Sequence, residues 1–197
     1  MNTYDNHIAI IGGGIAGLAL GIMLNRNNIP NIIFEKSANV SEYGAGISIS
    51  PNGKFVLEKL GILDEIKINS GNSLKTSFYS NLKKIITIDT NIITTSRKCL
   101  HDVLYKKFIN LGGKIKFDYE LDDIDTENKY IRFKNGELYK VLHIAACDGI
   151  KSLCHKKQSI LNNNPKYSGY SVWRTIFESN QTSINFHLGS NFHVVCY

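Results

Sequence analysis

A dense cluster of glycines near the start of the chain limits what it can fold into more than any other feature. Gly12, Gly13 and Gly14 are consecutive and Gly17 follows, within the stretch HIAIIGGGIAGLALGIML. The residues before the cluster, Ile8–Ile11, form a short and fully apolar run, which is typical of a strand buried on both faces. Because each glycine adds backbone entropy that folding must remove, such a density requires a structural or functional reason.

The residues after the glycines predict a helix and then a second strand. Apolar residues recur at helical spacing from Ile15 to Ile22, and Asn27-Asn28 tolerates the left-handed conformation in which helices end. Pro30 excludes further helix, and Asn31–Phe34 has the pattern of a second strand. The order strand, glycine turn, helix and strand predicts a complete βαβ unit.

The glycine spacing, GxGxxG, and the acid after the second strand are typical of a dinucleotide-binding site. Gly12 allows the tight turn, Gly14 lets a pyrophosphate approach the backbone, and Gly17 lets helix and strand pack closely. The helix N-terminus offers unpaired N–H groups to the phosphates. Glu35 lies where a carboxylate accepts ribose hydroxyls, and it would repel a 2′-phosphate, which disfavours NADP at this site. These residues alone leave open whether NAD or FAD binds.

The absence of charge between Ile8 and Leu24 is also a property of signal peptides and membrane spans. The preceding segment, 1–7, contains neither Lys nor Arg, whereas a secretory signal begins with positive charge. The glycines inside this run also disfavour a membrane helix. We therefore expect no transmembrane segment.

The basic character of the chain does not indicate nucleic-acid binding. The formal net charge is +6, but lysines outnumber arginines and are scattered rather than arranged in a stripe. The four cysteines form no CxxC pair and no metal-ligand spacing with the six histidines. We expect reduced thiols in a cytoplasmic protein that binds neither nucleic acid nor a metal ion.

Strands and helices continue to alternate after the βαβ unit. Ser50-Pro51 has the chemistry of a helix start, and Gly61 is expected to end that helix. Residues 76–90 alternate into two strands around a turn near Ser80-Asn81. The next helix is expected to be capped by Thr94-Thr95-Ser96 and to end at Gly112-Gly113.

The remaining segments add antiparallel strands. Asn135-Gly136 lies between YIRFK and ELYK, which is a strong hairpin signal. The run VLHIAACDG then predicts a buried strand leading into an acidic turn. After a single βαβ unit, this chain has insertions that are rich in strands. It therefore differs from a plain NAD domain, in which βαβ units continue without interruption.

Taken together, four segments make the chain resemble the FAD-dependent aromatic-ring monooxygenases of the p-hydroxybenzoate and salicylate hydroxylase type. They are GGGIAG with FEKS, GAGISISPNGKFVLEKLGILD, SRKCLHDVL, which is similar to the family's R-x-x-L-x-x-x-L helix start, and ACDGIKS, which is similar to its DG motif. YSGYSVWRTIF then resembles the entry to the family's substrate domain. The resemblance extends essentially over residues 6 to 197.

This resemblance implies an α/β fold: a Rossmann-like, glutathione-reductase-type FAD-binding domain with inserted antiparallel strands, and an incomplete substrate-domain sheet. It implies a discontinuous FAD-binding domain at 1–75 and 94–165, with a partial substrate domain at 76–93 and 166–197. The chain is then an N-terminal portion, because family members are nearly twice as long and carry a second flavin motif, a Gly-Asp pair, in the later part.

Site residues are carried over position by position from the resemblance. Asp148 is implied to hydrogen-bond the cofactor's sugar region, and Arg97 to reach the phosphate–ribityl region with a planar, permanently charged donor. One departure is His155, at a position where the family usually has Arg. The implied FAD-binding residues are Gly12, Gly14, Ala16 and Gly17 at the pyrophosphate, Glu35 and Lys36 at the ribose, Gly46 beside the flavin, Arg97, Leu121 near the adenine, and Asp148.

The implied activity is hydroxylation of a small aromatic substrate with NAD(P)H as co-substrate and O2 as oxygen donor. The cofactor carries the chemistry in such enzymes, so no catalytic side chain is assigned. A complementing C-terminal chain is a candidate partner. Two alternatives remain: a non-catalytic FAD-binding fragment, and a flavin-dependent reductase or oxidase on the same scaffold.

Overall fold

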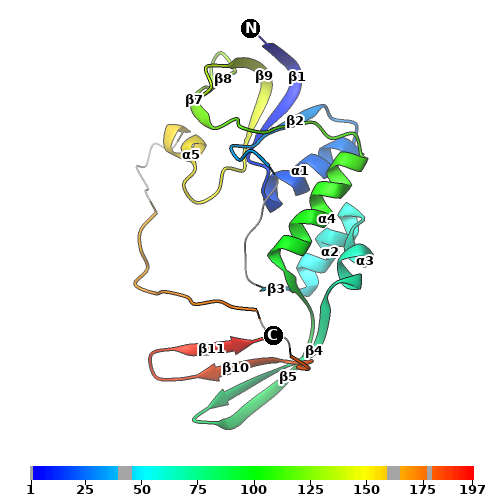
Figure 1. Cartoon of the computed structure of the whole chain (residues 1–197), viewed down its shortest axis with the longest axis vertical. Coiled ribbons are helices and arrows are strands. Elements are labelled where there is room, and N and C mark those ends of the chain that lie inside the picture. Colours follow the sequence, from blue (N-terminus) through cyan, green and yellow to red (C-terminus); the bar gives the residue numbers. More distant parts are fainter. Residues whose placement is uncertain (1, 40–45, 159–164, 177–178) are drawn as a thin grey trace. The chain divides into compact units, whose positions relative to one another are not determined.

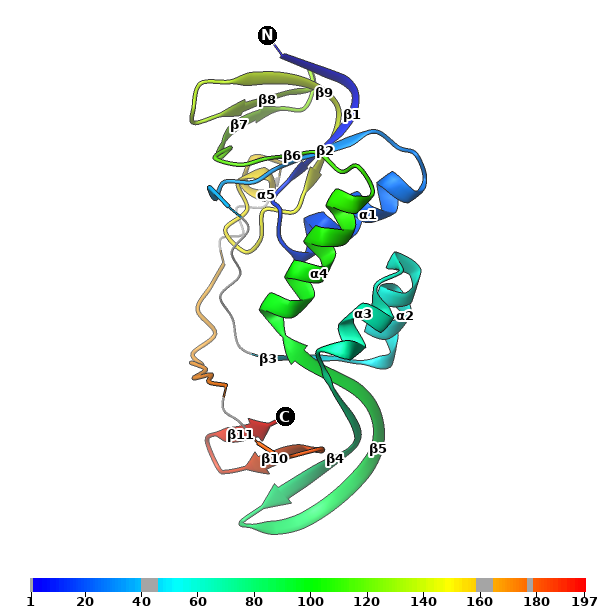
Figure 2. The same ribbon diagram turned by 45° about the vertical axis from the view of Figure 1, so that its right-hand side comes forward.

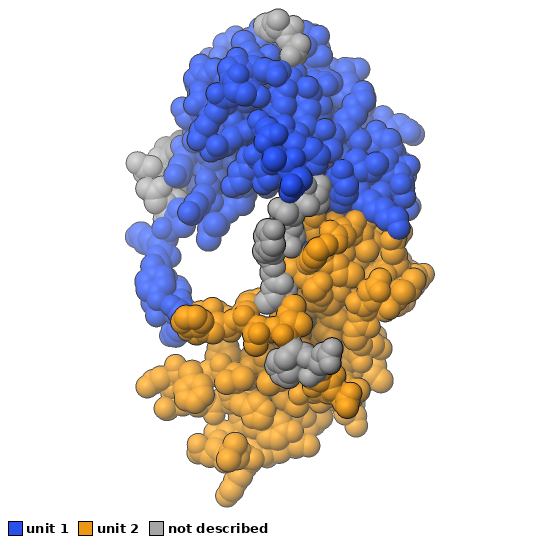
Figure 3. Space-filling view, viewed as in Figure 1, with its two compact units in different colours: residues 1–41, 104–171 blue, residues 42–103, 172–197 orange. Residues whose placement is uncertain are grey.

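The computed structural model describes residues 2–39, 46–158, 165–176 and 179–197. The chain divides into two compact units, Met1–Ser41 with Leu104–Ser171 and Glu42–Val103 with Val172–Tyr197 (Figure 3, blue and orange). Helix α4, Arg97–Asn110, begins in the second unit and ends in the first. The domain boundaries expected from the sequence remain predictions.

The first unit is built on a sheet of six strands in the order β6-β2-β1-β9-β8-β7 (Figure 1; β6 is labelled in Figure 2). Strand β1 lies between β2 and β9 and is parallel to both, and β6 is parallel to β2. Strands β7, β8 and β9 form an antiparallel meander. The elements are β1 (Asn2–Ile11), α1 (Ile15–Arg26), β2 (Asn31–Phe34), β6 (Ile115–Lys116), β7 (Leu121–Asp125), β8 (Tyr130–Phe133), β9 (Leu138–Ala146) and α5 (Leu153–Gln158).

The predicted α/β fold, with a βαβ unit and inserted antiparallel strands, is confirmed. All four residues of β2 are buried, as expected for a central parallel strand. Helix α1 ends at its C-cap Asn27, and Asn28 follows with a φ of 55°, the left-handed conformation expected there. Strand β1 begins six residues earlier than predicted, because Asn2–Tyr4 pair with Tyr139–Val141 of β9 before a bulge.

Apolar side chains beneath this sheet form its core. The meander contributes five of these side chains and the βαβ unit four, which explains why the inserted strands fold onto it. The buried cluster consists of Ala9, Ile11, Ile32, Phe34, Leu121, Ile131, Phe133, Tyr139, Val141 and Cys154.

The second unit contains a sheet of five strands in the order β11-β10-β4-β5-β3. Figure 2 shows β5 as a long, curved strand that follows β4. Strands β4 and β5 form the hairpin expected from the sequence, with its turn at Asn81-Leu82. The elements are β3 (Gly46–Ile49), α2 (Pro51–Leu60), α3 (Leu63–Ile68), β4 (Gly71–Ser80), β5 (Lys83–Ser96), β10 (Ile184–Leu188) and β11 (His193–Cys196).

Helix ends in this unit follow the sequence with one correction. Pro51 is the first residue of α2, and Gly61 ends it in the left-handed conformation. The expected capping by Thr94 and Thr95 is wrong, because β5 continues through both residues by pairing with β3. Only Ser96 caps α4: its Oγ accepts a hydrogen bond of 3.0 Å from the N–H of Cys99.

Among the described helices, none combines the length and apolar character needed to cross a membrane.

Candidate functional site

The candidate site lies at the carboxyl end of β1. Ile11, its last residue, pairs with Phe34 of β2 on one side and with Ala146 of β9 on the other. The chain leaves β1 towards β2 through α1, whereas β9 arrives from the meander. Parallel strands whose connections diverge in this way leave a crevice at their carboxyl ends, which is where α/β sheets bind ligands.

Gly12 makes the first turn after β1, and hydrogen bonds at this turn connect the end of β1 to β2 and to the residue after β9. Its N–H donates to Phe34 O at 2.8 Å, while the N–H of Cys147 donates to Ile11 O at 2.9 Å. Gly12 has a φ of 105°, and a β-carbon on it would stand 2.4 Å from the carbonyl oxygen of Cys147. Position 12 therefore accepts only glycine, for the reason predicted from the sequence.

The other two motif glycines differ in their surroundings. A β-carbon on Gly17 would stand 1.9 Å from Gly12 O, so this glycine allows the helix to pack on the turn. A β-carbon on Gly14 would have no described atom within 4 Å. Gly14 therefore does not serve internal packing, and it leaves open space beside the backbone.

The N-terminus of α1 lies at this space and carries N–H donors that the helix itself does not satisfy. The first hydrogen bond of the helix runs from Leu18 N–H to Gly14 O at 2.9 Å, so the N–H groups of Ile15, Ala16 and Gly17 have no acceptor inside the helix. The first turn of α1 carries no acidic side chain, so none competes with a phosphate for the positive end of the helix dipole. This arrangement fits a pyrophosphate.

Glu35 follows β2 and turns its carboxylate towards the glycine turn. Its Oε2 accepts a hydrogen bond of 2.6 Å from Gly13 N–H, and its Oε1 accepts one of 2.9 Å from Ser37 N–H. Each carboxylate oxygen has a second lone pair, which leaves capacity for ribose hydroxyls. Lys36 is exposed beside it.

Asp148 follows β9 and lines a cavity of about 620 Å³ together with Ala16, Ala146, Cys147, Ser152 and His155. The structure therefore brings Ala16 of the glycine motif and Asp148 of the DG motif to one cavity. His155, at the position where arginine was expected, also faces this cavity.

The Asp148 carboxylate organises the turn that follows it. It accepts hydrogen bonds from Ser152 Oγ at 2.6 Å and from the N–H groups of Leu153 at 2.8 Å and Cys154 at 3.1 Å. Burial alone would raise the pKa of Asp148, but these hydrogen bonds outweigh it and the pKa is lowered. Asp148 therefore stays ionised at the mouth of the cavity, and its contact with a sugar remains a prediction.

Leu121 begins β7 and is buried at 7% exposure in the core cluster. Two residues earlier, the N–H of Tyr119 donates to Glu35 O at 2.9 Å, so this part of the chain runs beside the end of β2. The role of Leu121 at an adenine remains a prediction.

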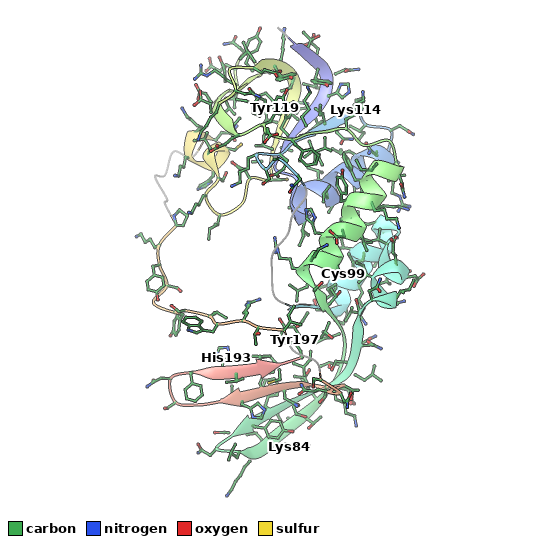
Figure 4. All side chains as sticks on the ribbon, in the orientation of Figure 1. Lys84, Cys99, Lys114, Tyr119, His193 and Tyr197 are labelled. Atoms are coloured by element: carbon green, nitrogen blue, oxygen red, sulfur yellow. The ribbon has the colours of Figure 1, made fainter. Side chains whose placement is uncertain are left out.

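Gly46 and Arg97 belong to the second unit. Gly46 begins β3, where its carbonyl oxygen accepts a hydrogen bond of 2.5 Å from the hydroxyl of Tyr197, the last residue, labelled in Figure 4. Arg97 is the first residue of α4 and is half-buried. Their contacts with a cofactor also remain predictions.

Sequence reasoning missed three features of the site. The hydrogen bonds of Glu35 to Gly13 and Ser37 and the carbonyl of Cys147 behind Gly12 are main-chain contacts that no residue type signals. The hydrogen bond from the Ser152 hydroxyl to the Asp148 carboxylate could have been predicted, since Asp148-Gly149 is followed by a serine within one turn.

The comparisons of this chain with known proteins, by sequence and by structure, agree with each other. A family model described as FAD binding domain matches residues 5–193. "Monooxygenase 1" of Arabidopsis thaliana is 32% identical over 169 residues, which are 81% of this chain and 41% of the relative. The 3-amino-4-hydroxybenzoate 2-monooxygenase of Streptomyces cremeus is 24% identical over 98% of this chain and 53% of its own.

A solved structure of 2-methyl-3-hydroxypyridine-5-carboxylic acid oxygenase is similar to this chain with a TM-score of 0.71 and 28% identity, over 75% of this chain and 40% of that one. The chain therefore spans about half the length of the relatives it matches, or less.

Proposed function

The chain belongs to the FAD-binding domain family, and from this premise we propose that it forms the FAD-binding portion of a monooxygenase that hydroxylates a small aromatic substrate with NAD(P)H and O2. The relatives that share its sequence are named as monooxygenases, and one of them acts on a hydroxybenzoate. The protein is then an oxidoreductase whose chemistry is supplied by a bound flavin.

The observation that carries this proposal is the environment of Gly14. Three features occur together at the start of α1: open space beside Gly14, three helix N–H groups without an intrahelical acceptor, and a cavity lined by both Ala16 and Asp148. A turn glycine needed only for packing would resemble Gly12 or Gly17, whose β-carbons would collide with backbone.

The residues of this chain would bind and orient the cofactor. Gly12, Gly14, Ala16 and Gly17 would hold the pyrophosphate, Glu35 the ribose hydroxyls, and Asp148 the sugar region beside the cavity. When bound, FAD supplies the redox chemistry, exchanging electrons with NAD(P)H and with O2. Lys36, Gly46, Arg97 and Leu121 are proposed as further contacts on the grounds of the resemblance.

Substrate selection requires more than the described residues provide. Because the relatives extend to about twice the matched length, we propose that further polypeptide, in the same chain or in a complementing one, supplies the rest of the substrate site. A FAD-binding module without turnover is the second candidate.

Retention of FAD after desalting, read from flavin absorbance, tests the proposal. The folded chain is expected to retain FAD, and Gly14→Ala is expected to weaken FAD binding at least tenfold, since a methyl group would occupy the phosphate's space. Met23→Ala, on an exposed position of the same helix, is the control. A folded chain that binds no FAD, or a Gly14→Ala variant with unchanged affinity, contradicts the proposed site.

Turnover then separates three outcomes. Hydroxylated product, formed with NAD(P)H, O2 and the polypeptide that supplies the rest of the substrate site, supports the monooxygenase. Consumption of NAD(P)H without hydroxylated product supports a reductase or oxidase, and FAD binding without NAD(P)H consumption supports the non-catalytic module.

A further inference from the structure

A cluster of four polar and aromatic side chains lies beside Glu35, and no role has been given to it above. It consists of Lys116, Tyr119, Glu137 and Tyr139, here called the tyrosine–carboxylate cluster. Tyr119 is labelled in Figure 4 within the first unit. Lys116 belongs to β6, Tyr119 to the segment after it, Glu137 directly precedes β9 and Tyr139 lies at the beginning of β9. The cluster therefore connects parts of the chain that are distant in sequence.

The Glu137 carboxylate is the centre of the cluster. The Tyr119 hydroxyl donates to Glu137 Oε1 at 2.8 Å, and the Tyr139 hydroxyl donates to Oε2. The two phenol oxygens lie 3.1 Å apart. Tyr139 is buried at 1% exposure, so removal of either partner would leave a polar atom poorly satisfied away from water.

The ammonium group of Lys116 lies over the rings of Tyr119 and Tyr139. Its Nζ donates to the Tyr119 hydroxyl at 3.3 Å and stands 5.0 Å and 5.4 Å from the ring centroids of Tyr119 and Tyr139. The phenol of Tyr139 raises the pKa of Lys116, and the phenol of Tyr119 adds to this effect. Burial acts in the opposite direction but does not prevail. The ammonium group therefore remains charged.

The same two residues, Lys116 and Tyr119, also hold the main chain of Glu35. Glu35 N–H donates to Lys116 O at 2.8 Å, and Tyr119 N–H donates to Glu35 O at 2.9 Å. Both main-chain groups of Glu35 are thus fixed by residues whose side chains belong to the cluster. The Glu35 carboxylate in turn meets the glycine turn at Gly13 N–H, 2.6 Å away.

The ring of Phe34 makes a second connection between the cluster and the site. Phe34 directly precedes Glu35 and packs against Tyr119 and Tyr139, with ring centroids 5.4 Å and 5.1 Å away. The residue before the acid and the two residues bonded to its main chain therefore move only with the cluster. A shift of the phenols would change where the Glu35 carboxylate points.

We propose that the tyrosine–carboxylate cluster positions Glu35 for the ribose hydroxyls of the bound cofactor, and that Tyr119 and Glu137 are positioning residues for its adenosine end. This inference rests on the proposed FAD site. Neither residue touches the ligand in this account: their effect reaches it through the main chain and carboxylate of Glu35.

The test compares two adenine nucleotides that differ only in the groups that Glu35 would bind. ADP carries both ribose hydroxyls, and 2′,3′-dideoxy-ADP carries neither. Glu137→Gln and Tyr119→Phe are expected to weaken ADP binding about tenfold and to leave dideoxy-ADP binding unchanged, measured by titration calorimetry. Tyr130→Phe, on β8 outside the cluster, is the matched control and is expected to change neither affinity.

A double-mutant cycle with Glu35→Gln adds a second measurement. If Glu137 acts through Glu35, then Glu137→Gln has no further effect on ADP affinity once Glu35 is replaced. Equal loss of both nucleotides, or an undiminished effect in the Glu35→Gln background, overturns the inference and indicates a purely structural role. Failure of the unsubstituted chain to bind ADP and FAD at all overturns the proposed site itself. Should Glu137→Gln not fold, as judged by circular dichroism, Tyr119→Phe alone decides the result.

Discussion

Gly17 and Gly12 are in direct contact: a β-carbon on Gly17 would stand 1.9 Å from the carbonyl oxygen of Gly12. Because that oxygen is main chain, the collision cannot be relieved by turning a side chain. Gly17→Ala is therefore expected to destabilise the fold by about 3 kcal/mol, the upper range for overpacked sites. Denaturant unfolding monitored by circular dichroism measures this change.

Gly14→Ala is the matched comparison for that variant. No described atom lies within 4 Å of a β-carbon at position 14. Alanine is a poorer N-cap residue than glycine, which destabilises the folded chain. Alanine also reduces the freedom of the unfolded chain, which stabilises the fold. These effects oppose each other, so the free energy of unfolding is expected to change by no more than about 1 kcal/mol. Equal destabilisation by the two alanines would show that the glycines do not have separate tasks.

The Asp148 carboxylate gives the stability of the chain an acid dependence. Its pKa in the folded state is lowered by hydrogen bonds from Ser152, Cys154 and Leu153 that prevail over burial. Such a group stabilises the fold above its unfolded pKa of about 3.9, and the contribution is lost as pH falls through the lower folded value.

Asp148→Asn is accordingly expected to lower the free energy of unfolding by about 1 kcal/mol at pH 7, as for the loss of a helix cap. The difference from the unsubstituted chain should shrink as pH falls below the unfolded pKa of about 3.9 and through the lower folded value, because the carboxyl is then protonated in both states. Unfolding curves across this range measure it. A difference that stays constant with pH would mean that the charge of Asp148 is not responsible.

Cys154 is expected to resist alkylation. It is buried at 3% exposure, and burial together with the negative charge of Asp148 raises its pKa to about 12. Since the thiolate is the reactive form, the folded chain at pH 8 should be modified at Cys154 slower than the unfolded chain by a factor on the order of a thousand. Peptide mass spectrometry after iodoacetamide treatment measures this, with the partly exposed Cys99 and Cys196 as internal references.

Local patterns in the sequence predicted the fold of the first unit well. The strand before the glycines, the helix to Arg26 and the second strand Asn31–Phe34 depend on neighbouring residues and were found as expected. The hairpin at Asn135-Gly136 is equally local and was found as expected, with Gly136 at a positive φ of 84°. The turn at Gly12 and the close packing at Gly17 also followed from the spacing, whereas the role of Gly14 at a pyrophosphate stays a prediction.

The features that could not be predicted depend on contacts between distant residues. Thr94 and Thr95 have the chemistry of helix caps, but pairing with β3 keeps them in a strand. Nothing in the sequence relates Tyr119 to Glu137 or either of them to Glu35, because their contacts arise only when the meander folds onto β2. The main-chain groups that contact Glu35 cannot be predicted from residue types.

The turn between β4 and β5 contains a residue whose type does not suit its backbone. Ser80 pairs with Lys83, so the loop consists of Asn81 and Leu82, with φ values of 48° and 63°. Two positive φ values define a type I′ turn, for which Asn-Gly is the preferred pair. Leucine in this conformation costs roughly 1–2 kcal/mol because its β-carbon crowds the following carbonyl.

Leu82→Gly is therefore expected to stabilise the chain by about 1 kcal/mol, since glycine removes that strain but adds freedom to the unfolded chain. The leucine side chain is 93% exposed, so its loss removes almost no packing. Leu82→Ala is the control: it deletes the same apolar surface but keeps a β-carbon, and it should leave stability nearly unchanged. If alanine stabilises the chain as much as glycine does, exposed apolar surface and not backbone strain is the cause. Thermal unfolding of the three proteins at equal concentration distinguishes these outcomes.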